Sequence, residues 1–295
     1  MSSSPLFDRF APLLFLLLWS TGWIAARAIT PYADPLTFLS WRYTLAAAAL
    51  VIFAVFSGAR WPHRAIDWGH GFVSGIMIHA IYLGGVWWAV RHGVPATISA
   101  LLAAIQPILT TVLAPYIAKE RIRPLQWLGV ALGFFGLLIV LSPKLIGIDT
   151  GMLGKVAFPL IVNALCMVSV TLGAFYQKRF IPTGDLRTMT VLQYIGALAV
   201  TLPVAFLIEP MHVTWNLPVI ATMVWSVFGL SIGAIVLYLM LIRHGAVSRP
   251  AQLIFLVPPT AAVQAWLLFG ESLSLLQIGG MAVTALGVAL ASRKS

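Results

Sequence analysis

The chain has little charge and almost no cysteine. Of its 295 residues, only 9% are Asp, Glu, Lys or Arg, against about 25% in a typical soluble domain. This scarcity excludes a water-soluble enzyme and a disordered chain. The single cysteine, Cys166, cannot form an intrachain disulfide. A disulfide-stapled secreted domain is therefore excluded, and redox chemistry or a cysteine metal cluster is poorly supported.

Apolar residues dominate instead. They make up 60% of the chain, and the mean hydropathy is +0.97. The apolar runs are long, as at residues 13–18 and 134–141, and lack the strict alternation of barrel strands. Because a helix needs about 20 apolar residues to cross a bilayer, the sequence predicts an all-α membrane protein with ten transmembrane helices. The expected spans are residues 10–29, 36–56, 68–90, 95–118, 125–142, 156–177, 187–208, 218–242, 249–270 and 273–292.

The first apolar segment has some features of a signal peptide. Residues 10–25 could form its core, and Ala26-Arg27-Ala28 resembles a cleavage site. However, Asp8 accompanies Arg9 in the preceding residues, so this region is not clearly positive, and the same segment recurs in the middle of the chain. We therefore expect the first helix to be retained.

The chain repeats itself at an offset of 151 or 152 residues. The matches include Pro, Asp, Glu and an Arg-His-Gly triplet in the same order, which chance alignment of apolar residues explains poorly. The matched pairs include Gly22 and Gly173, Pro31 and Pro182, Asp34 and Asp185, Tyr43 and Tyr194, Arg91-His92-Gly93 and Arg243-His244-Gly245, and Glu120 and Glu271. The sequence thus predicts two five-helix repeats, residues 1–150 and 151–295. Because five is odd, the second repeat must have inverted topology, an arrangement that places a substrate site near the midplane between the repeats.

The net charge of +10 is unevenly distributed over the expected loops. With ten spans, 13 cations fall on the side of the two termini, four fall on the other side, and Arg42 lies within a span. The 13 are Arg9, Arg60, Arg64, Lys119, Arg121, Arg123, Lys178, Arg179, Arg187, Arg243, Arg249, Arg293 and Lys294. By the positive-inside rule, both termini are cytoplasmic. The basic excess therefore reports membrane orientation, no nucleic-acid partner is expected, and the short loops suit a bacterial inner (cytoplasmic) membrane.

Two matching stretches resemble a known family. Lys119-Glu120-Arg121 through Gly136, and Gly270-Glu271-Ser272 through Gly287, each place a Glu after the fourth helix of a repeat and before a Gly-rich fifth helix. In these features the chain resembles the EamA-type drug/metabolite transporters over nearly its whole length. Within that group it is most similar to the bacterial aromatic and neutral amino-acid exporters. The resemblance implies ten helices around a central cavity that opens to each side in turn, and export as the direction of transport.

Polar groups at mid-membrane depth are costly, so each is a candidate for substrate contact. His79 lies at the midpoint of the third span, and Tyr82 follows one turn later on the same face. Together they could hydrogen-bond an amino or carboxylate group, or stack on a ring. The alternative is that His79 bonds a neighbouring helix and serves packing alone.

Prolines interrupt the fourth and ninth spans at matching places. Gln106-Pro107 lies at the centre of one, and Pro258-Pro259 at the equivalent place in the other. Proline removes a helical hydrogen bond and clashes with the carbonyl four residues earlier, so Gln106 beside a freed carbonyl is a candidate substrate contact. Pro107, Pro258 and Pro259 are candidate hinges for opening and closing. Membrane helices also tolerate proline without bending, and this alternative stays open.

Three more residues are candidates for the cavity wall. Trp19 lies mid-span, far from the interfaces where tryptophan collects, and either faces a cavity or packs in the core. Asn163 either faces the cavity or bonds another helix. Tyr43 is a candidate contact, whereas its neighbour Arg42 either attracts a carboxylate or snorkels to the surface, which costs less. Tryptophans near span ends are expected to be interfacial anchors: Trp61, Trp68, Trp87, Trp88 and Trp215.

The carboxylates are absent from the span centres. All eight fall in loops or at helix ends, which argues against a proton-driven exporter of cationic drugs. There is no Walker A loop and no His-Glu-x-x-His pair. We therefore expect no ATP hydrolysis, no catalytic residue, no metal and no cofactor.

The sequence as a whole predicts a transporter that works by alternating access without ATP. Its expected substrates are small neutral or zwitterionic metabolites, most of all exported amino acids. Its expected partners are that substrate and the lipid bilayer, and a monomer is compatible with the pattern. Two alternatives remain: an intramembrane enzyme that acts on a lipid through His79, and a transporter for another metabolite class. A structural scaffold fits the midplane polar residues less well.

Overall fold

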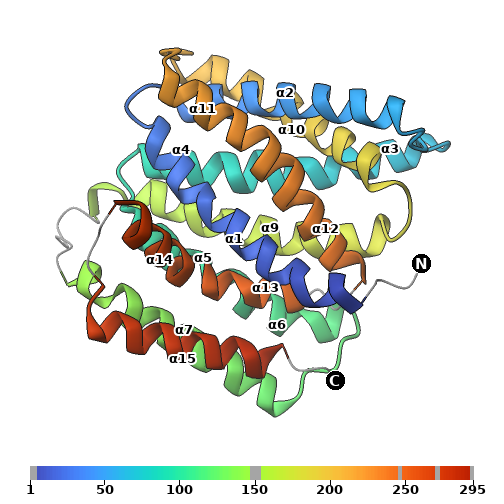
Figure 1. Cartoon of the computed structure of the whole chain (residues 1–295). Helices are drawn as coiled ribbons and strands as arrows, with labels where there is room; N and C mark the ends of the chain where they lie inside the picture. The colour runs from blue at the N-terminus through green and yellow to red at the C-terminus, as the bar shows by residue number, and fades with distance from the viewer. Residues whose placement is uncertain (1–4, 147–153, 245–247, 270–272, 293–295) are drawn as a thin grey trace.

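The computed structural model describes residues 5–146, 154–244, 248–269 and 273–292. These form a bundle of helices that run between two ends, with α1 beginning and α15 ending at the same end (Figure 1). The first half contains α1 (Pro5–Ile29), α2 (Pro35–Phe56), α3 (Ala65–Gly75), η1 (Ile76–Gly84), α4 (Gly85–Arg91), α5 (Ala96–Ala103), α6 (Ile105–Ile117) and α7 (Pro124–Leu145). The second half contains α9 (Ala157–Phe180), α10 (Leu186–Ile208), α11 (Leu217–Trp225), η2 (Ser226–Ala234), α12 (Ile235–His244), α13 (Ser248–Leu253), η3 (Ile254–Leu256), α14 (Val257–Phe269) and α15 (Leu275–Ala291).

Seven helical segments among these residues are long and apolar enough to cross a membrane. They are Pro35–Phe56, Ala65–Arg91, Ile98–Ile117, Pro124–Pro143, Ala157–Phe180, Leu186–Ile208 and Leu217–Arg243. Two shorter apolar helices cover Phe10–Ala26 and Leu275–Ala291. Within the described ranges the only β-pairing is an isolated bridge between Ala33 and Val213. The all-helical prediction is therefore confirmed for this part of the chain, while Glu271 of the second repeated motif lies outside it.

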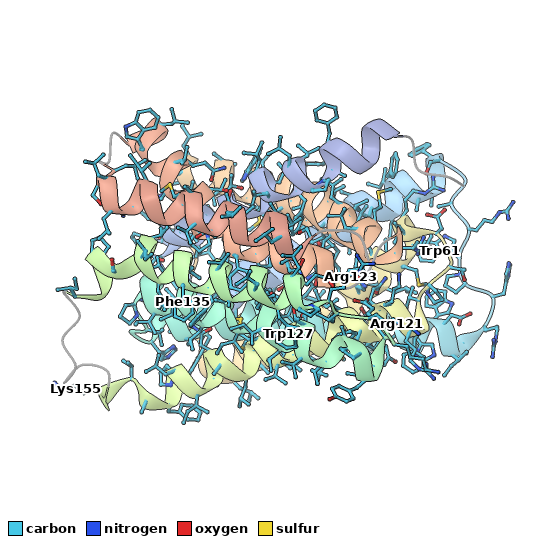
Figure 2. All side chains as sticks on the ribbon, turned by 90° about the horizontal axis from the view of Figure 1, so that it is seen from below. Trp61, Arg121, Arg123, Trp127, Phe135 and Lys155 are labelled. Atoms are coloured by element: carbon cyan, nitrogen blue, oxygen red, sulfur yellow. The ribbon has the colours of Figure 1, made fainter. Side chains whose placement is uncertain are left out.

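The outer surface of the bundle is apolar. Phe56 and Leu207 are 86% and 82% exposed, and Phe135 is 59% exposed. In Figure 2, Phe135 and Trp127 lie along the body of the bundle, Arg121 and Arg123 lie toward one end, and Lys155 lies at the opposite end. Large exposed apolar side chains suit contact with lipid and not with water. With seven candidate spans, this surface makes the protein a multi-pass membrane protein.

Helices α7 and α15 pack together along their glycines and lie side by side in Figure 1. A Cβ atom placed on Gly129 would lie 2.3 Å from the backbone nitrogen of Ala291, and one on Gly287 would lie 2.3 Å from that of Gly133. Side chains at these positions would push the helices apart. The Gly-rich ends of the repeats therefore serve close backbone packing, as the sequence predicts for membrane helices.

Helices α2 and α10 pack side by side and antiparallel. Asp34, just before α2, accepts a 2.9 Å hydrogen bond from the backbone N–H of His212, just after α10. Asp185, just before α10, accepts one of 3.3 Å from the backbone N–H of Arg60, just after α2. Each aspartate thus holds the loop that follows the partner helix. The repeated aspartates of the sequence are structural ties at opposite ends of the bundle.

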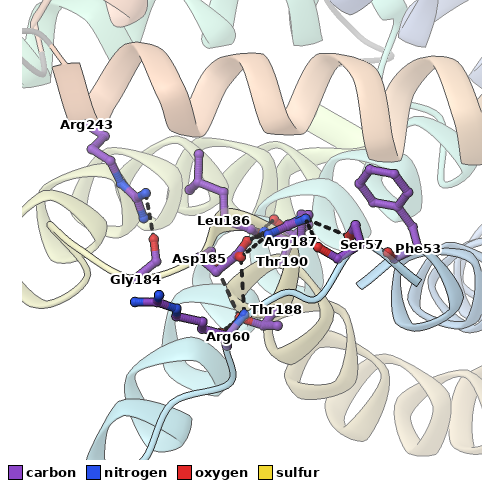
Figure 3. Close-up of polar contacts among 10 residues, drawn as sticks. All are labelled: Phe53, Ser57, Arg60, Gly184, Asp185, Leu186, Arg187, Thr188, Thr190 and Arg243. Atoms are coloured by element: carbon purple, nitrogen blue, oxygen red, sulfur yellow. Dashed lines mark hydrogen bonds and ion pairs between the residues drawn. The ribbon is translucent and has the colours of Figure 1, made fainter. Parts of the chain in front are cut away.

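Each tie is reinforced by a second charged side chain. Glu209 accepts hydrogen bonds at the N-terminus of α2 from the backbone N–H groups of Leu36 (2.9 Å) and Thr37 (2.8 Å), where a negative charge is favoured. At the other end, Arg187 is hydrogen-bonded to Asp185 and donates to Ser57 Oγ at 2.6 Å (Figure 3). These contacts fix α2 against α10, and this pair in turn positions the site.

Two pairs of helix irregularities occur at equivalent places in the repeats. The π-helical stretches η1 and η2 interrupt the spans Ala65–Arg91 and Leu217–Arg243. The second pair precedes the prolines: α5 ends at Ala103, four residues before Pro107, and the 3₁₀ turn η3 begins at Ile254, four residues before Pro258. The breaks thus lie where the proline spacing predicts lost helical hydrogen bonds.

Candidate functional site

Two tyrosines fasten the π-helical stretches at the centre of the bundle. The Tyr43 hydroxyl of α2 donates to the backbone carbonyl of His79 in η1 at 3.0 Å, and the Tyr194 hydroxyl of α10 donates to that of Ser231 in η2 at 2.6 Å. Both tyrosines are fully buried, and their rings stack on each other with centroids 5.6 Å apart. π-helical turns are rare and frequent at functional sites. Both π-helical stretches contribute residues to the wall of a cavity, and the two tyrosines lie behind that wall.

The cavity has a volume of about 60 Å³. It lies among α1, α2, the η1–α4 segment and the η2–α12 segment, so both halves of the chain contribute to its wall. Its polar and aromatic lining consists of Trp19, Arg42, His79, Tyr82 and Trp87. The rest of the lining is apolar or glycine. A mostly apolar hollow with a few placed polar groups is the usual form of a small-molecule site.

Arg42 is the charged member of this lining, and it does not snorkel. Its side chain is only 4% exposed, and its Nε donates to Ser231 Oγ at 2.7 Å. The expectation that snorkelling is favoured is therefore wrong, because this face of α2 packs against η2 and not toward the surface. No ion pair joins Arg42 to any carboxylate of the described residues. A guanidinium with five N–H donors thus has one bonded donor and faces the cavity.

His79 contributes a second polar group that is not fully paired. It is 1% exposed, and its ring lies 4.7 Å from that of Tyr194 and 6.0 Å from that of Tyr43. Its Nε2 atom makes no hydrogen bond of standard geometry, although the Gln193 side chain lies close enough to act on the ring. Tyr82 follows on the same wall, 8% exposed. The structure therefore brings His79 and Tyr82 together at the cavity.

Trp19 both faces the cavity and packs in the core, which are the two alternatives expected from its place in the first span. It lines the cavity and also joins an aromatic cluster, with its ring 5.1 Å from Phe15 and 5.5 Å from Tyr238. Gln106 lies on the far side of this cluster, where its amide contacts the Tyr238 hydroxyl. Its Oε1 atom is buried without a partner, and it is not a lining residue.

Asn163 and Trp87 are placed differently from the other candidates. Asn163 Nδ2 donates to Ser99 Oγ at 2.7 Å, a bond between α9 and α5, and Asn163 does not line the cavity.

Trp87 is 7% exposed, lines the cavity and stacks on Phe38, with the ring centroids 5.9 Å apart. The interpretation of Trp87 as an interfacial anchor is wrong, because the cavity reaches this turn of α4 and draws the ring inward.

The position equivalent to Arg42 in the second half belongs to a buried polar network, in which the Gln193 Oε1 atom makes no hydrogen bond of standard geometry to the described residues. Gln193 Nε2 donates to Gln177 Oε1 at 2.8 Å and to Ser74 Oγ at 3.0 Å, and Ser74 Oγ donates to the same Gln177 oxygen at 2.9 Å. A Cβ atom on Gly75 would lie 1.9 Å from the Gln193 carbonyl oxygen. The two halves thus differ: Arg42 faces a cavity, whereas Gln193 is packed. The internal repeat aligns the charged Arg42 with the uncharged Gln193. This difference could have indicated from the sequence that the two positions have different surroundings.

The chain matches the EamA-like transporter family over residues 10–142 and 157–293. The uncharacterized transporter YvbV of Bacillus subtilis (strain 168) is 24% identical over 287 residues, which cover 96% of this chain and 91% of the relative. A probable amino-acid metabolite efflux pump of Salmonella typhimurium (strain LT2) is 24% identical over 292 residues, covering 95% and 93%. The uncharacterized inner membrane transporter YedA of Escherichia coli (strain K12) is 25% identical over 291 residues, covering 97% and 90%.

A solved crystal structure has the same fold. It superposes with a TM-score of 0.78 at 19% sequence identity and covers 96% of each chain. The family match and the relatives, each aligned over most of its length, are consistent with a membrane-embedded helical bundle. The two matched segments include most of both halves, and the chain therefore belongs to the EamA-like transporter family.

Proposed function

We propose that this transporter moves small neutral or zwitterionic metabolites, and amino acids above all, by alternating access without ATP. The observation that carries the proposal is the cavity between the two halves, where the terminal nitrogens of Arg42 and the Nε2 atom of His79 make no hydrogen bond of standard geometry to the described residues. Unpaired polar groups in a membrane interior are costly unless a ligand uses them. The printed name of the Salmonella relative, an amino-acid metabolite efflux pump, supports amino acids and export.

The proposed architecture is ten transmembrane helices in two five-helix repeats of inverted topology, residues 1–150 and 151–295. The antiparallel pairing of α2 and α10 supports the inversion, as do the matching π-helical stretches η1 and η2. Both termini are proposed to be cytoplasmic in a bacterial inner membrane. The Arg121 and Arg123 side chains at one end and the inner-membrane relative support this placement.

The contrast between the halves supports alternating access. The cavity beside Arg42 is the accessible site, while the network of Gln193, Gln177 and Ser74 closes the equivalent region. In an inverted repeat, the site opens to the other side of the membrane when the two halves exchange conformations. The helix breaks before Pro107, Pro258 and Pro259 are proposed as hinges of this exchange.

The proposed substrate contacts fall into two groups. Trp19, His79 and Tyr82 line the cavity and would touch a substrate in this state. Tyr43, Gln106 and Asn163 lie behind the lining, and we propose that they contact substrate only after the helices have moved. A zwitterion with an apolar side chain suits a wall that combines aromatic rings with a few hydrogen-bonding groups.

The direct test uses purified protein in liposomes. Labelled phenylalanine, tryptophan, alanine, threonine, lysine and glutamate are followed across the bilayer without ATP, with protein-free liposomes as background. We expect the aromatic and neutral amino acids to move. If none of the six crosses while a bilayer lipid is chemically converted, the protein is an enzyme and the transport proposal is wrong.

A single substitution tests the site. His79→Ala should raise the KM for the transported amino acid by about tenfold, because a buried ring nitrogen that can hydrogen-bond the substrate is lost from the cavity wall. His92→Ala is the matched control, since His92 is exposed and its Nδ1 contacts the Trp88 carbonyl at 2.8 Å, outside the cavity. Equal kinetics for both variants would remove His79 from the site.

A further inference from the structure

We propose that the cavity recognises a carboxylate held by Arg42, and that this group is the one every substrate must carry, whereas an amino group is dispensable. This inference rests on the proposed transport function and redefines its substrate class as monocarboxylates, which include amino acids and also the anions of deaminated acids. Three observations carry it: the charge of the cavity, the free donors of Arg42 and the absence of an acidic partner for an ammonium group.

The charge of the cavity is not balanced by the surrounding protein. Arg42 is 4% exposed, and no carboxylate of the described residues pairs with it. The two acids at the start of α2, the helix that carries Arg42, are engaged elsewhere: Asp34 binds the His212 backbone and Glu209 binds the N–H groups of Leu36 and Thr37. A buried charge without a counter-ion is strongly destabilising. An arriving carboxylate would supply the missing charge.

The geometry of Arg42 leaves the donors for such a group. Its Nε is fixed by Ser231 Oγ at 2.7 Å, which orients the guanidinium plane. The two terminal nitrogens make no hydrogen bond within the described part of the chain, and Arg42 lines the cavity. Arginine binds carboxylates through two parallel N–H···O bonds, among the strongest hydrogen bonds in proteins. Ser231 therefore acts as a positioning residue for the anchor.

An ammonium group would find much less in the same cavity. Among the described residues, its lining contains no Asp or Glu. What remains is the His79 ring nitrogen, the Tyr82 hydroxyl and the ring faces of Trp19 and Trp87, none of which is an anionic partner. Cation–π contacts are worth only about 0.5–2 kcal/mol. An amino acid can thus bind, but its carboxylate provides the larger share of recognition. A molecule with the ammonium alone adds a second positive charge beside Arg42.

The repeat itself supplies a suitable replacement for the test. The position equivalent to Arg42 is occupied by Gln193, which is fully buried. Glutamine is therefore a side chain that this fold accommodates at such a position. Arg42→Gln removes the charge with a small change in volume, and Arg42→Lys keeps the charge but loses the two-bond geometry.

Three compounds separate the two ends of an amino acid: L-phenylalanine, its amide L-phenylalaninamide, and its deaminated acid 3-phenylpropionate. They compete with labelled phenylalanine for transport in liposomes, and their binding to the detergent-purified protein is followed by tryptophan fluorescence. We expect 3-phenylpropionate to compete within about threefold of phenylalanine, and the amide to be at least about tenfold weaker. Arg42→Gln should weaken both acids by about tenfold or more and leave the amide unchanged, with Arg42→Lys between wild type and Arg42→Gln.

The control is Arg121→Gln, which removes a cation at the end of the bundle, outside the cavity. Gel-filtration elution and the unfolding temperature show whether each variant is folded. If Arg42→Gln does not fold, Arg42→Lys and the wild-type ranking of the three compounds still test whether Arg42 binds the carboxylate. The inference is overturned if the amide competes as well as the acids, if folded Arg42→Gln keeps wild-type affinity, or if wild type binds neither acid. Binding of 3-phenylpropionate through Arg42 without any amino-acid transport would instead overturn the proposed function alone.

Discussion

Arg42 and Ser231 come from opposite halves of the chain and are joined by a 2.7 Å hydrogen bond from Nε to Oγ. Ser231 is fully buried, and its backbone carbonyl accepts a second hydrogen bond from Tyr194. One residue of η2 therefore holds an arginine from the first half and a tyrosine from the second. The cavity wall depends on this residue at the meeting point of the halves.

The first prediction concerns the side chain of that residue. Ser231→Ala should lower the free energy of unfolding by about 1.5–3 kcal/mol, because a buried hydrogen bond to a charged group is lost. Thermal unfolding in detergent measures the effect. The control Thr222→Ala removes an exposed hydroxyl whose 2.7 Å bond is to the Pro218 carbonyl of its own helix, and it should shift the unfolding temperature little. Equal shifts for the two variants would show that the Arg42 contact contributes no stability.

The two buried tyrosines give a second prediction. Tyr43→Phe and Tyr194→Phe each leave a π-helical carbonyl without its hydroxyl donor. Each substitution should lower the free energy of unfolding by about 1–3 kcal/mol. Since the rings stack at 5.6 Å and both hydroxyls brace neighbouring stretches, the double variant should depart from additivity. Tyr116→Phe, at a position 81% exposed, is the control. Wild-type unfolding temperatures for both single variants would contradict this account of η1 and η2.

The close packing of α7 and α15 gives a third prediction, with neighbouring glycines as test and control. A Cβ at Gly280 would lie 2.8 Å from the Val140 nitrogen, whereas one at Gly279 would meet nothing within 4 Å. Gly280→Ala should destabilise the protein by about 1–3 kcal/mol through overpacking. Gly279→Ala should be neutral or stabilising by up to about 1 kcal/mol, since alanine favours helix. The same sign for both substitutions would refute the packing account.

Acid stability gives a fourth prediction. The hydrogen-bonded Arg187 side chain lowers the pKa of Asp185 from its ordinary value. A carboxyl whose folded-state pKa is depressed contributes stability above its unfolded pKa of about 3.9 and loses it as the pH falls through the folded-state pKa. Asp185→Asn should therefore reduce the unfolding temperature at pH 7, and the difference from wild type should shrink below about pH 4. Asp67→Asn removes a carboxylate from the first turn of α3 as a control. A pH-independent difference would mean that the Asp185 charge is not involved.

The helix breaks give a fifth prediction. Pro107→Ala restores a helical N–H at the junction of α5 and α6, which removes the cause of the break. If the junction is a hinge, the transport rate should fall several-fold while the KM changes little, because the cavity lining does not include this residue. Pro115→Ala, later in the same helix, is the matched control. A changed KM with an unchanged maximal rate would assign Pro107 to binding.

The helices could be predicted closely because apolar length, proline and loop charge define membrane spans one segment at a time. The predicted span 36–56 corresponds to Pro35–Phe56, and the predicted span 187–208 to Leu186–Ile208. The convergence of His79 and Tyr82 on one wall followed from helical spacing in the same way. These features depend on local sequence alone.

The rest depends on how each helix is turned about its own axis, which local sequence does not encode. Whether Arg42 snorkels or faces η2 is decided by α10 and η2, packed from far along the chain. The inward turn of Trp87 likewise depends on Phe38 and the cavity. No residue pattern in 76–84 or 226–234 predicts that these stretches are π-helical. One sequence signal does bear on Arg42: the repeat matches it with Gln193, so the charge is present in only one of the two halves.

The ties at α2 and α10 bear on what each half can do alone. Asp34 closes on a loop of the second half, and Asp185 closes on a loop of the first. A fragment that ended near residue 150 would leave the start of α2 without Glu209 and the loop at Arg60 without its carboxylate. The duplicated halves have thus become mutually dependent: each supplies the end groups that complete the other. We therefore expect a single half to be less stable than the pair, and we expect motion between the halves to keep these contacts of α2 and α10 intact.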